Sequence, residues 1–301
     1  VGLTGPVTFL VLGFVNGLTS GFSVKVAQAF GAGDEARVRR AVGMSYLLCV
    51  AVAVVVTAVA VPLTAPLMRL MQTPSADYDY AYRYLLIIFC GIGATVFYNI
   101  VAGLLRAVGD SRTPLYFLVA AAVLNVGLDF AFIMGCGWHY CGAALATVLS
   151  QLLSGGACLA YALYRYPVLR PVRSDFGWDT RLAMGHFAVG LPMALQFSIT
   201  AIGCIVQQTA LNGLDAALPG AVTAYTAASK IDNIANQVFV ALGTALATYA
   251  GQNYGAGEFG RIRRGVLAGM VYVFAGSVIG FAFAVGLCEP LMKLFLNTDL
   301  S

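Results

Sequence analysis

Charged residues are scarce in this sequence. Asp, Glu, Lys and Arg make up 10% of its 301 residues, hydrophobic residues make up 60%, and the mean hydropathy is +0.84. A soluble domain needs far less apolar surface to fill one core, because its outer face must meet water. The composition therefore argues against a soluble globular protein and predicts an integral membrane protein.

The sequence motifs of enzymes and ATP-driven pumps are also missing. There is no Gly-rich phosphate loop followed by Lys and Ser or Thr, which argues against an ATP-driven pump. There is no His-Glu-x-x-His, Gly-x-Ser-x-Gly or carboxylate pair that would suggest a hydrolase. Seven cysteines in a chain of this size do not make a disulfide scaffold. We therefore predict no enzymatic activity, no organic cofactor and no resident metal. Cys136 and Cys141 share a short hairpin, where they either form a disulfide or stay reduced.

Long apolar runs are what the sequence does contain. About 20 apolar residues suffice to cross the hydrocarbon core of a bilayer as a helix. Six runs of that length carry no charge: Val1 to Val24, Ala41 to Met68, Tyr84 to Leu105, Tyr140 to Tyr164, Asn233 to Gly257 and Gly265 to Cys288. Two more, 113–138 and 182–214, carry one ionisable residue each, Asp129 and His186. We predict eight membrane-spanning helices in an all-α fold, because the short alternating strands of a barrel are absent.

The basic residues predict the orientation of these spans. Lys and Arg collect in cytoplasmic loops, and twelve of the 17 basic residues lie in the loops after the first, third, fifth and seventh spans: Arg37, Arg39, Arg40, Arg106, Arg112, Arg165, Arg170, Arg173, Arg181, Arg261, Arg263 and Arg264. We therefore place these loops in the cytoplasm. The net charge of +4 reflects the same asymmetry and gives no reason to expect nucleic acid as a partner.

The chain repeats itself at a fixed offset. FGAGDEARVRR begins at Phe30 and YGAGEFGRIRR begins at Tyr254, an offset of 224, and Pro66 falls on Pro290 in the same register. This interval holds six predicted spans, and both copies lie in predicted cytoplasmic loops. We therefore predict two parallel six-helix bundles related by an axis along the membrane normal.

The repeat also predicts the domain boundaries. We expect an N-terminal bundle over residues 1–165, a cytoplasmic linker over 166–181 and a C-terminal bundle over 182–301. Projecting the repeat outward predicts one helix before Val1 and three after Ser301. We thus expect a fragment that covers helices two to nine of twelve.

Five short motifs along the chain point to a known protein family. AQAFGAGD, LLRAVGDSRTP, LNVGLDFAFI, CGAALATVLSQ and AGQNYGAGE occur in this order, and together they resemble the multidrug and toxic compound extrusion (MATE) family. The resemblance implies two six-helix bundles around a central cavity. It also implies a monomeric antiporter of the bacterial inner (plasma) membrane that exports small organic compounds, often cations, in exchange for Na⁺ or H⁺.

Asp129 is the acidic residue that lies deep inside an apolar span. A charge buried in a membrane is costly, so an ionisable residue there is a functional hypothesis by default. Asn125 lies one helical turn away on the same face, and Thr147 lies at the same depth on the next helix, about 8 to 9 Å below the outer end. Three oxygen donors suit a hard cation, and a desolvated carboxylate suits a proton. The alternative is that Asn125 and Thr147 only hold helices together by hydrogen bonds.

The resemblance assigns roles to some of these residues. It places the cation site of the N-terminal bundle on Asn125, Asp129 and Thr147, completed by an Asp of the helix that precedes Val1. The span over 182–214 carries no carboxylate, which departs from some MATE subfamilies. Its Gln196 and Gln207 either contact substrate in the cavity or pack between helices. We expect His186, at the inner end of this span, to lie at the membrane interface.

Two alternative functions remain at this point. A lipid-linked precursor flippase of the same superfamily would carry a polyanionic substrate and would need basic residues inside its cavity. The arginines of this chain lie mostly in predicted loops, which favours the drug antiporter. A narrow metabolite exporter is the second alternative, because the sequence does not identify the substrate.

Overall fold

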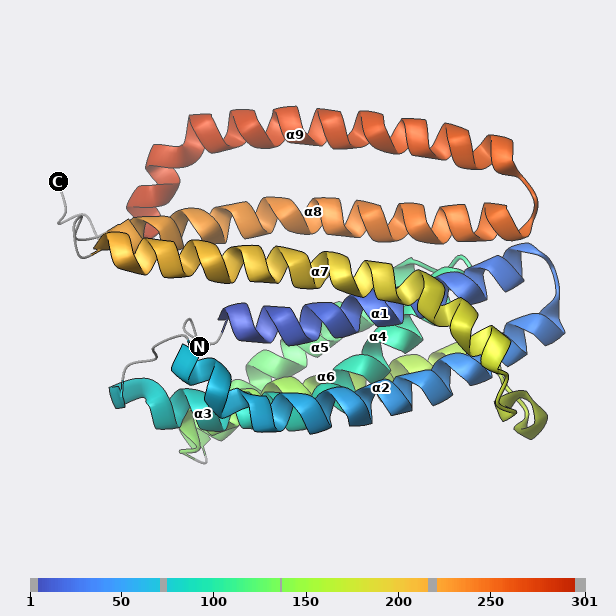
Figure 1. Ribbon diagram of the computed structural model, residues 1–301, viewed down its shortest axis with the longest axis horizontal. Coiled ribbons are helices and arrows are strands. Elements are labelled where there is room, and N and C mark those ends of the chain that lie inside the picture. Colours follow the sequence, from blue (N-terminus) through green and yellow to red (C-terminus); the bar gives the residue numbers. More distant parts are fainter. Residues whose placement is uncertain (1–4, 71–74, 136, 216–220, 296–301) are drawn as a thin grey trace.

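The computed structural model of the protein describes residues 5–70, 75–135, 137–215 and 221–295. Within these ranges the chain forms long helices and no strand (Figure 1). The helices are α1 (Gly5–Gly31), α2 (Glu35–Leu70), α3 (Ser75–Cys90), α4 (Ile92–Ala107), α5 (Arg112–Phe130), α6 (His139–Arg165), α7 (Thr180–Asp215), α8 (Ala221–Gly255) and α9 (Phe259–Phe295). The predicted all-α membrane fold is confirmed.

Most of the predicted membrane spans correspond to single helices. Six helices in the described part of the chain are long and apolar enough to cross a membrane, and α3 with α4 makes a seventh span if this bent pair is one unit. The remaining predicted span, over 233–257, falls in α8, which is not among these seven.

The predicted span from Tyr84 to Leu105 is bent. The chain bends by 45° between α3 and α4, at Gly91. Glycine is a weak helix former, and a Cβ at this position would lie 2.2 Å from Cγ2 of Val148 on α6. The bend therefore sits where α6 approaches the backbone most closely.

The sequence repeat has the same structure in both copies. Helix α1 ends at Gly31 and α8 ends at Gly255, at the offset of 224 seen in the sequence. The following turns contain Gly33 and Gly257, with φ of 73° and 74°, in the left-handed region that favours glycine. Asp34 then caps α2, because its Oδ1 accepts the backbone N–H of the residue three positions later at 2.9 Å. Glu258, its counterpart, instead lies 3.9 Å from the arginine three positions later.

The arginine-containing loops gather at one end of the molecule. Figure 1 shows the α1–α2 loop, the linker between α6 and α7, and the α8–α9 loop at the same end of the helices. We call this the arginine-rich end, and the charge pattern predicts that it faces the cytoplasm. Helices α1 and α8 run in the same direction, as parallel halves require.

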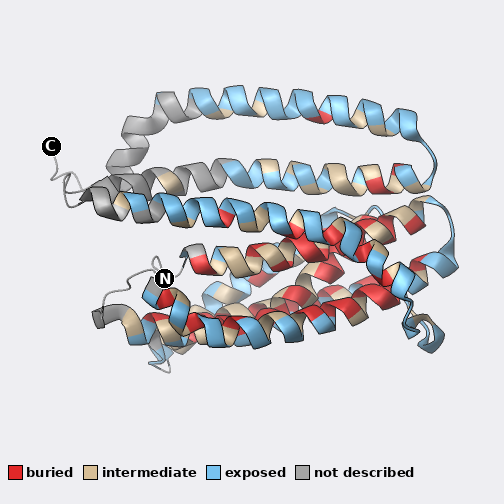
Figure 2. Ribbon diagram, viewed as in Figure 1, coloured by how far each residue is buried: buried red, intermediate tan, exposed pale blue. Residues whose placement is uncertain are grey.

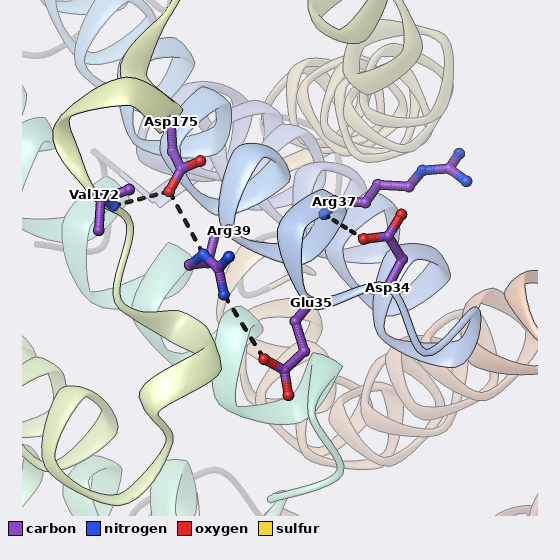
Figure 3. A network of polar contacts seen from close by, with 6 residues as sticks. All are labelled: Asp34, Glu35, Arg37, Arg39, Val172 and Asp175. Carbon is purple, nitrogen blue, oxygen red and sulfur yellow. Dashed lines mark hydrogen bonds and ion pairs between the residues drawn. The ribbon is translucent and has the colours of Figure 1, made fainter.

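The linker is attached to the start of α2. It contains two short 3₁₀ turns, Pro167–Leu169 and Arg173–Phe176. Asp175 accepts the N–H of Val172 at 2.9 Å, and the same carboxylate lies 3.8 Å from Nε of Arg39, which also pairs with Glu35 (Figure 3). A Cβ on Gly43 would lie 2.5 Å from the carbonyl oxygen of Asp175. The linker therefore packs directly against α2.

Buried side chains concentrate between α1, α2 and α4 (Figure 2). The largest of them are Phe22, Phe89, Met44, Leu48, Leu85 and Ile92. Helix α9 packs against α8, and its other apolar side chains are mostly exposed. A broad exposed apolar surface suits contact with lipid.

A hydrogen-bonded carboxylate joins the α4–α5 turn to the linker. The backbone N–H of Thr113 donates to Oδ1 of Asp110 at 3.0 Å, and the Tyr166 hydroxyl donates to Oδ2 at 3.1 Å. Burial alone would raise the pKa of Asp110, but the hydrogen bonds to Thr113 and Tyr166 outweigh burial and lower this pKa. The carboxylate therefore stabilises the fold in its ionised form.

We expect Tyr166→Phe to lower the melting temperature in detergent by about 2 °C, because one hydrogen bond of about 1 kcal/mol is lost. A lowered carboxyl pKa contributes stability that is present above about pH 4 and is lost as the pH falls through the folded-state value. The difference between wild type and Tyr166→Phe should thus shrink at pH 3. Tyr164→Phe is the control, because that side chain is 82% exposed; an equal effect of both variants would contradict this account.

Candidate cation site

The helical hairpin of α5 and α6 brings two of the predicted site residues together. The side-chain amide of Asn125 donates to Oγ1 of Thr147 at 3.5 Å. The Thr147 hydroxyl donates in turn to the carbonyl of Ala143 at 2.9 Å. Its remaining lone pair is free to accept a further donor or to contact a cation.

A tight connection fixes the register of this hairpin. Helix α5 continues into a π-turn over Ala131–Gly135, and the N–H of Trp138 donates to the carbonyl of Phe132 at 2.9 Å. Their rings stack at 5.5 Å, and a Cβ on Gly142 would lie 2.9 Å from Cβ of Phe132. Such π-turns recur near functional sites. Here the turn follows Asp129 by two residues.

Asp129 carries an unsatisfied oxygen. Its side chain is half-buried, and Oδ1 is shielded from solvent without a hydrogen-bond partner in the described part of the chain. A buried carboxylate oxygen without a partner is costly, so native structures nearly always supply one. A bound metal cation would supply the partner here, and a bound proton would remove the charge.

A small cavity lies between α1 and Tyr84 of α3. Tyr84 of α3 is close enough to Asp129 to interact with its charge. The same tyrosine lines a cavity of about 300 Å³ together with Thr8 and Asn16 of α1. Thr8 has a buried Oγ1 without a partner, and Asn16 accepts a hydrogen bond from Nδ2 of Asn99. Tyr84 thus shares this cavity with polar side chains of α1.

Sequence reasoning missed this cavity and the polar residues near it. Asn16 and Asn99 are neutral amides inside apolar spans, and 83 positions separate them in the chain. Neutral amides and hydroxyls in such spans are expensive to leave unpaired, so a list of them would have been a usable signal. Tyr84 carried no such signal, because aromatic residues are common throughout the spans.

The donor set suits a monovalent cation better than a structural metal. A carboxylate, an amide oxygen and a hydroxyl are hard ligands of the kind that bind cations such as Na⁺, and the carboxylate alone can carry H⁺. In the described residues there is no group of three or more His, Cys, Asp or Glu side chains that could hold a metal. Cys141 is a free thiol, and Cys136 lies outside the described residues.

The other candidate residues lie on α7. Gln196 and Gln207 are both exposed, and neither belongs to the cluster around Asp129. The expected position of His186 at the membrane interface stays a prediction, and the structure buries this side chain completely within the protein. The reason is the close approach of α1 to α7, which a hydropathy pattern does not encode.

Comparison with known proteins decides the family. The sequence model of the MatE family matches residues 1–131 and 192–300. The chain belongs to the MatE family. This agrees with the resemblance of the five motifs and with the helical bundle described above.

Curated MATE relatives cover nearly all of this chain. It is 27% identical to the probable multidrug resistance protein YoeA of Bacillus subtilis and 30% identical to the probable multidrug resistance protein NorM of Bradyrhizobium diazoefficiens, over 97% and 98% of its length. It is also 24% identical, over 99% of its length, to a protein named FAD transporter from Shewanella oneidensis, of which it spans 66%. The chain spans 64% of the length of YoeA and of NorM.

Solved structures show the same fold. A multidrug resistance MATE family transporter of the MOP superfamily, in an outward-facing conformation, superimposes with a TM-score of 0.87 at 25% identity, over 99% of this chain and 66% of the other. A MOP superfamily transporter from Pyrococcus furiosus gives a TM-score of 0.88 at 24% identity, over 100% of this chain and 66% of the other. The chain therefore has the fold of a membrane transporter.

Proposed function

We propose that the protein is a secondary active antiporter that exports small organic compounds in exchange for Na⁺ or H⁺. The observation that carries the proposal is the buried, unpartnered Oδ1 of Asp129 next to the Asn125–Thr147 pair, in a chain of the MatE family. A cation that binds there satisfies the carboxylate. It changes the hydrogen bonding of the α5–α6 hairpin in the same step.

Exchange requires that the cation-bound protein and the protein bound to the organic compound prefer different conformations. In this proposal, residues 1–165 and 182–301 form two bundles, joined by the linker over 166–181, that rock about a central cavity. A cation from outside favours the state that releases the organic compound outward, because it binds the two states with different affinity. Gln196 and Gln207 are proposed to contact the compound. The protein is proposed to work as a monomer in the bacterial inner membrane, without organic cofactor or enzymatic activity.

Export from living cells tests this function. We expect the full-length protein, expressed in efflux-deficient cells, to lower the accumulation of a fluorescent organic cation relative to empty vector. The effect should depend on external Na⁺ at constant pH, or on pH at constant Na⁺, and this dependence identifies the coupling ion. Unchanged accumulation over a panel of dyes would contradict drug export.

A narrow metabolite exporter is the second candidate. The observation that favours it is the likeness to the protein named FAD transporter, which covers 99% of this chain. Flavin release into the medium distinguishes the two functions when it is measured in the same cells. Flavin export without dye export would favour the metabolite exporter.

A further inference from the structure

The helices assigned to the two bundles touch at the arginine-rich end. Helix α1 packs against α7 and α8, and the contacts depend on glycine. A Cβ on Gly21 would lie 2.2 Å from Cα of Gly190 on α7, and a Cβ on Gly31 would lie 1.9 Å from the carbonyl oxygen of Gln252 on α8. The close contact with α7 extends to Gly17, where a Cβ would lie 2.5 Å from the carbonyl oxygen of Met193, and space is open around Gly5, at the other end of α1. The contact between bundles is therefore closed at the arginine-rich end.

His186 lies inside this contact. It sits two turns into α7 and is fully buried. Its Nε2 lies 3.2 Å from Oγ of Ser45 on α2, and its Nδ1 lies 2.8 Å from the carbonyl of Leu182. The ring meets Phe22 of α1 edge-on, at 5.8 Å between centroids. One imidazole thus joins α7 to both α1 and α2.

The partners fix the roles of the two ring nitrogens. A carbonyl only accepts, so Nδ1 must donate its proton to Leu182. In the neutral ring Nε2 is then an acceptor, and Ser45 donates to it. The Ser45 hydroxyl also lies 2.7 Å from the carbonyl of Ala41, so its proton can serve either partner. When the Ser45 proton points to the ring, the neutral imidazole is satisfied at both nitrogens.

The charges around the ring disfavour the imidazolium. Lys25 of α1 interacts electrostatically with His186, and its Nζ would lie 3.7 Å from a Cβ on Gly185, the neighbouring residue. Lys25 itself donates to Gln28 at 3.1 Å rather than to a carboxylate. From α2, the polar group that faces the ring is the neutral Ser45. No carboxylate of the described residues lies within ion-pair distance of His186. The free energy needed to bury a second positive charge here is larger than the stabilisation from one added hydrogen bond.

We propose that His186 is a proton-responsive latch between the two bundles: the neutral imidazole holds the arginine-rich end closed, and its protonation releases that end. The inference rests on the proposed function, because alternating access requires the bundles to part there. It adds a second titratable position to the transporter, at the opposite end of the helices from the α5–α6 connection.

The direction of the pH effect follows from the protonation of His186 in the closed and the open state. When the end opens, the imidazole meets water and titrates near its ordinary value of about 6.5. The closed state excludes that proton, so closure is fully favoured above about pH 6.5 and weakens as the pH falls below it. At pH 5.5 the ratio of closed to open molecules should be about tenfold lower than at pH 8. An acidified cytoplasm would therefore slow the step that closes this end.

Distance measurements between spin labels test the latch without any substrate. Labels at Arg40→Cys on α2 and Met184→Cys on α7, two exposed positions, are placed in the full-length protein without its native cysteines. We expect the short-distance population to give way to a longer one between pH 8 and pH 5.5, by about tenfold in ratio. No change over this pH range would overturn the proposal.

Two variants separate the latch from a merely structural role. His186→Gln keeps a neutral polar side chain and should remove the pH response, whereas His139→Gln, at the other histidine of the sequence, should keep it. A pH response that survives His186→Gln in a monodisperse protein would overturn the proposal. Ser45→Ala should lower the closed population already at pH 8; an unchanged population would count against the Ser45 contact. A protein that exports no dye but shows the pH-dependent distance would refute the antiporter and leave the latch intact.

Discussion

Asp129→Asn is expected to abolish ion-driven export while the protein still folds. The amide has nearly the same shape as the carboxylate but no charge, so it neither carries a proton nor neutralises a cation. Loss of an interaction with a charged group is worth about 3 kcal/mol, which corresponds to about 100-fold in ion affinity. The measurement is dye export by the full-length protein at saturating Na⁺ and at low external pH, with expression and monodispersity checked in parallel.

Matched variants make this result specific. Asp79→Asn removes an exposed carboxylate that pairs with Arg83 at 3.0 Å, and it should leave export unchanged. Thr147→Val removes the hydroxyl that meets Asn125 and should weaken the ion dependence about tenfold, while Thr147→Ser should not. Wild-type export and ion dependence in Asp129→Asn would contradict the assignment of the site.

Alanine at Gly31 or at Gly255 is expected to disrupt the crossing of α1 and α8. A Cβ at Gly31 would lie 1.9 Å from the carbonyl oxygen of Gln252, and a Cβ at Gly255 would lie 1.9 Å from that of Gln28. Backbone atoms cannot rotate away, so the helices must separate, at a cost of about 1 to 3 kcal/mol. We expect a melting temperature lower by several degrees, about 2 to 4 °C for each kcal/mol, and reduced export.

The repeat makes this prediction unusually specific. Gln28 and Gly31 correspond to Gln252 and Gly255 at the offset of 224, so the two contacts are related by the pseudo-two-fold axis and should have similar effects. The double variant should lose less stability than the sum of the losses in the two single variants, because both substitutions separate the same pair of helices. Gly260→Ala is the control, since its Cβ would meet nothing within 4 Å. Equal melting temperatures for all three single variants would contradict the close crossing.

The sequence predicts the helices and the turns of the repeat well. Gly33 and Gly257 repeat at one offset, and the matching positive φ angles follow from the residue type. The Asp34 cap follows from the same phrase. These features are local, so residue type and spacing determine them.

The contact of Asn125 with Thr147 is also predictable, for a geometric reason. A short hairpin joins α5 to α6, so residues equally distant from it lie at the same depth. The unpartnered oxygen of Asp129 is not predictable in this way. It depends on which side chains of neighbouring helices, such as Tyr84 of α3, come near.

The close packing of neighbouring helices is what the sequence did not predict. Helix α1 is apolar around most of its circumference, so its pattern does not indicate which face meets α7 and which meets lipid. The burial of His186 and the bend at Gly91 both result from such close approaches. Side-chain volume on a neighbouring helix, such as that of Val148, determines these details, and periodicity does not report it.

Substrate-driven ion movement tests the central claim most directly. The full-length protein is reconstituted in proteoliposomes, and a gradient of an organic cation is imposed without any ion gradient. The account predicts that Na⁺ or H⁺ moves opposite to the organic cation in wild type, and that this ion flux disappears in Asp129→Asn. Movement of the organic cation with no opposing ion flux, or an equal ion flux in Asp129→Asn, would contradict antiport through the Asp129 site.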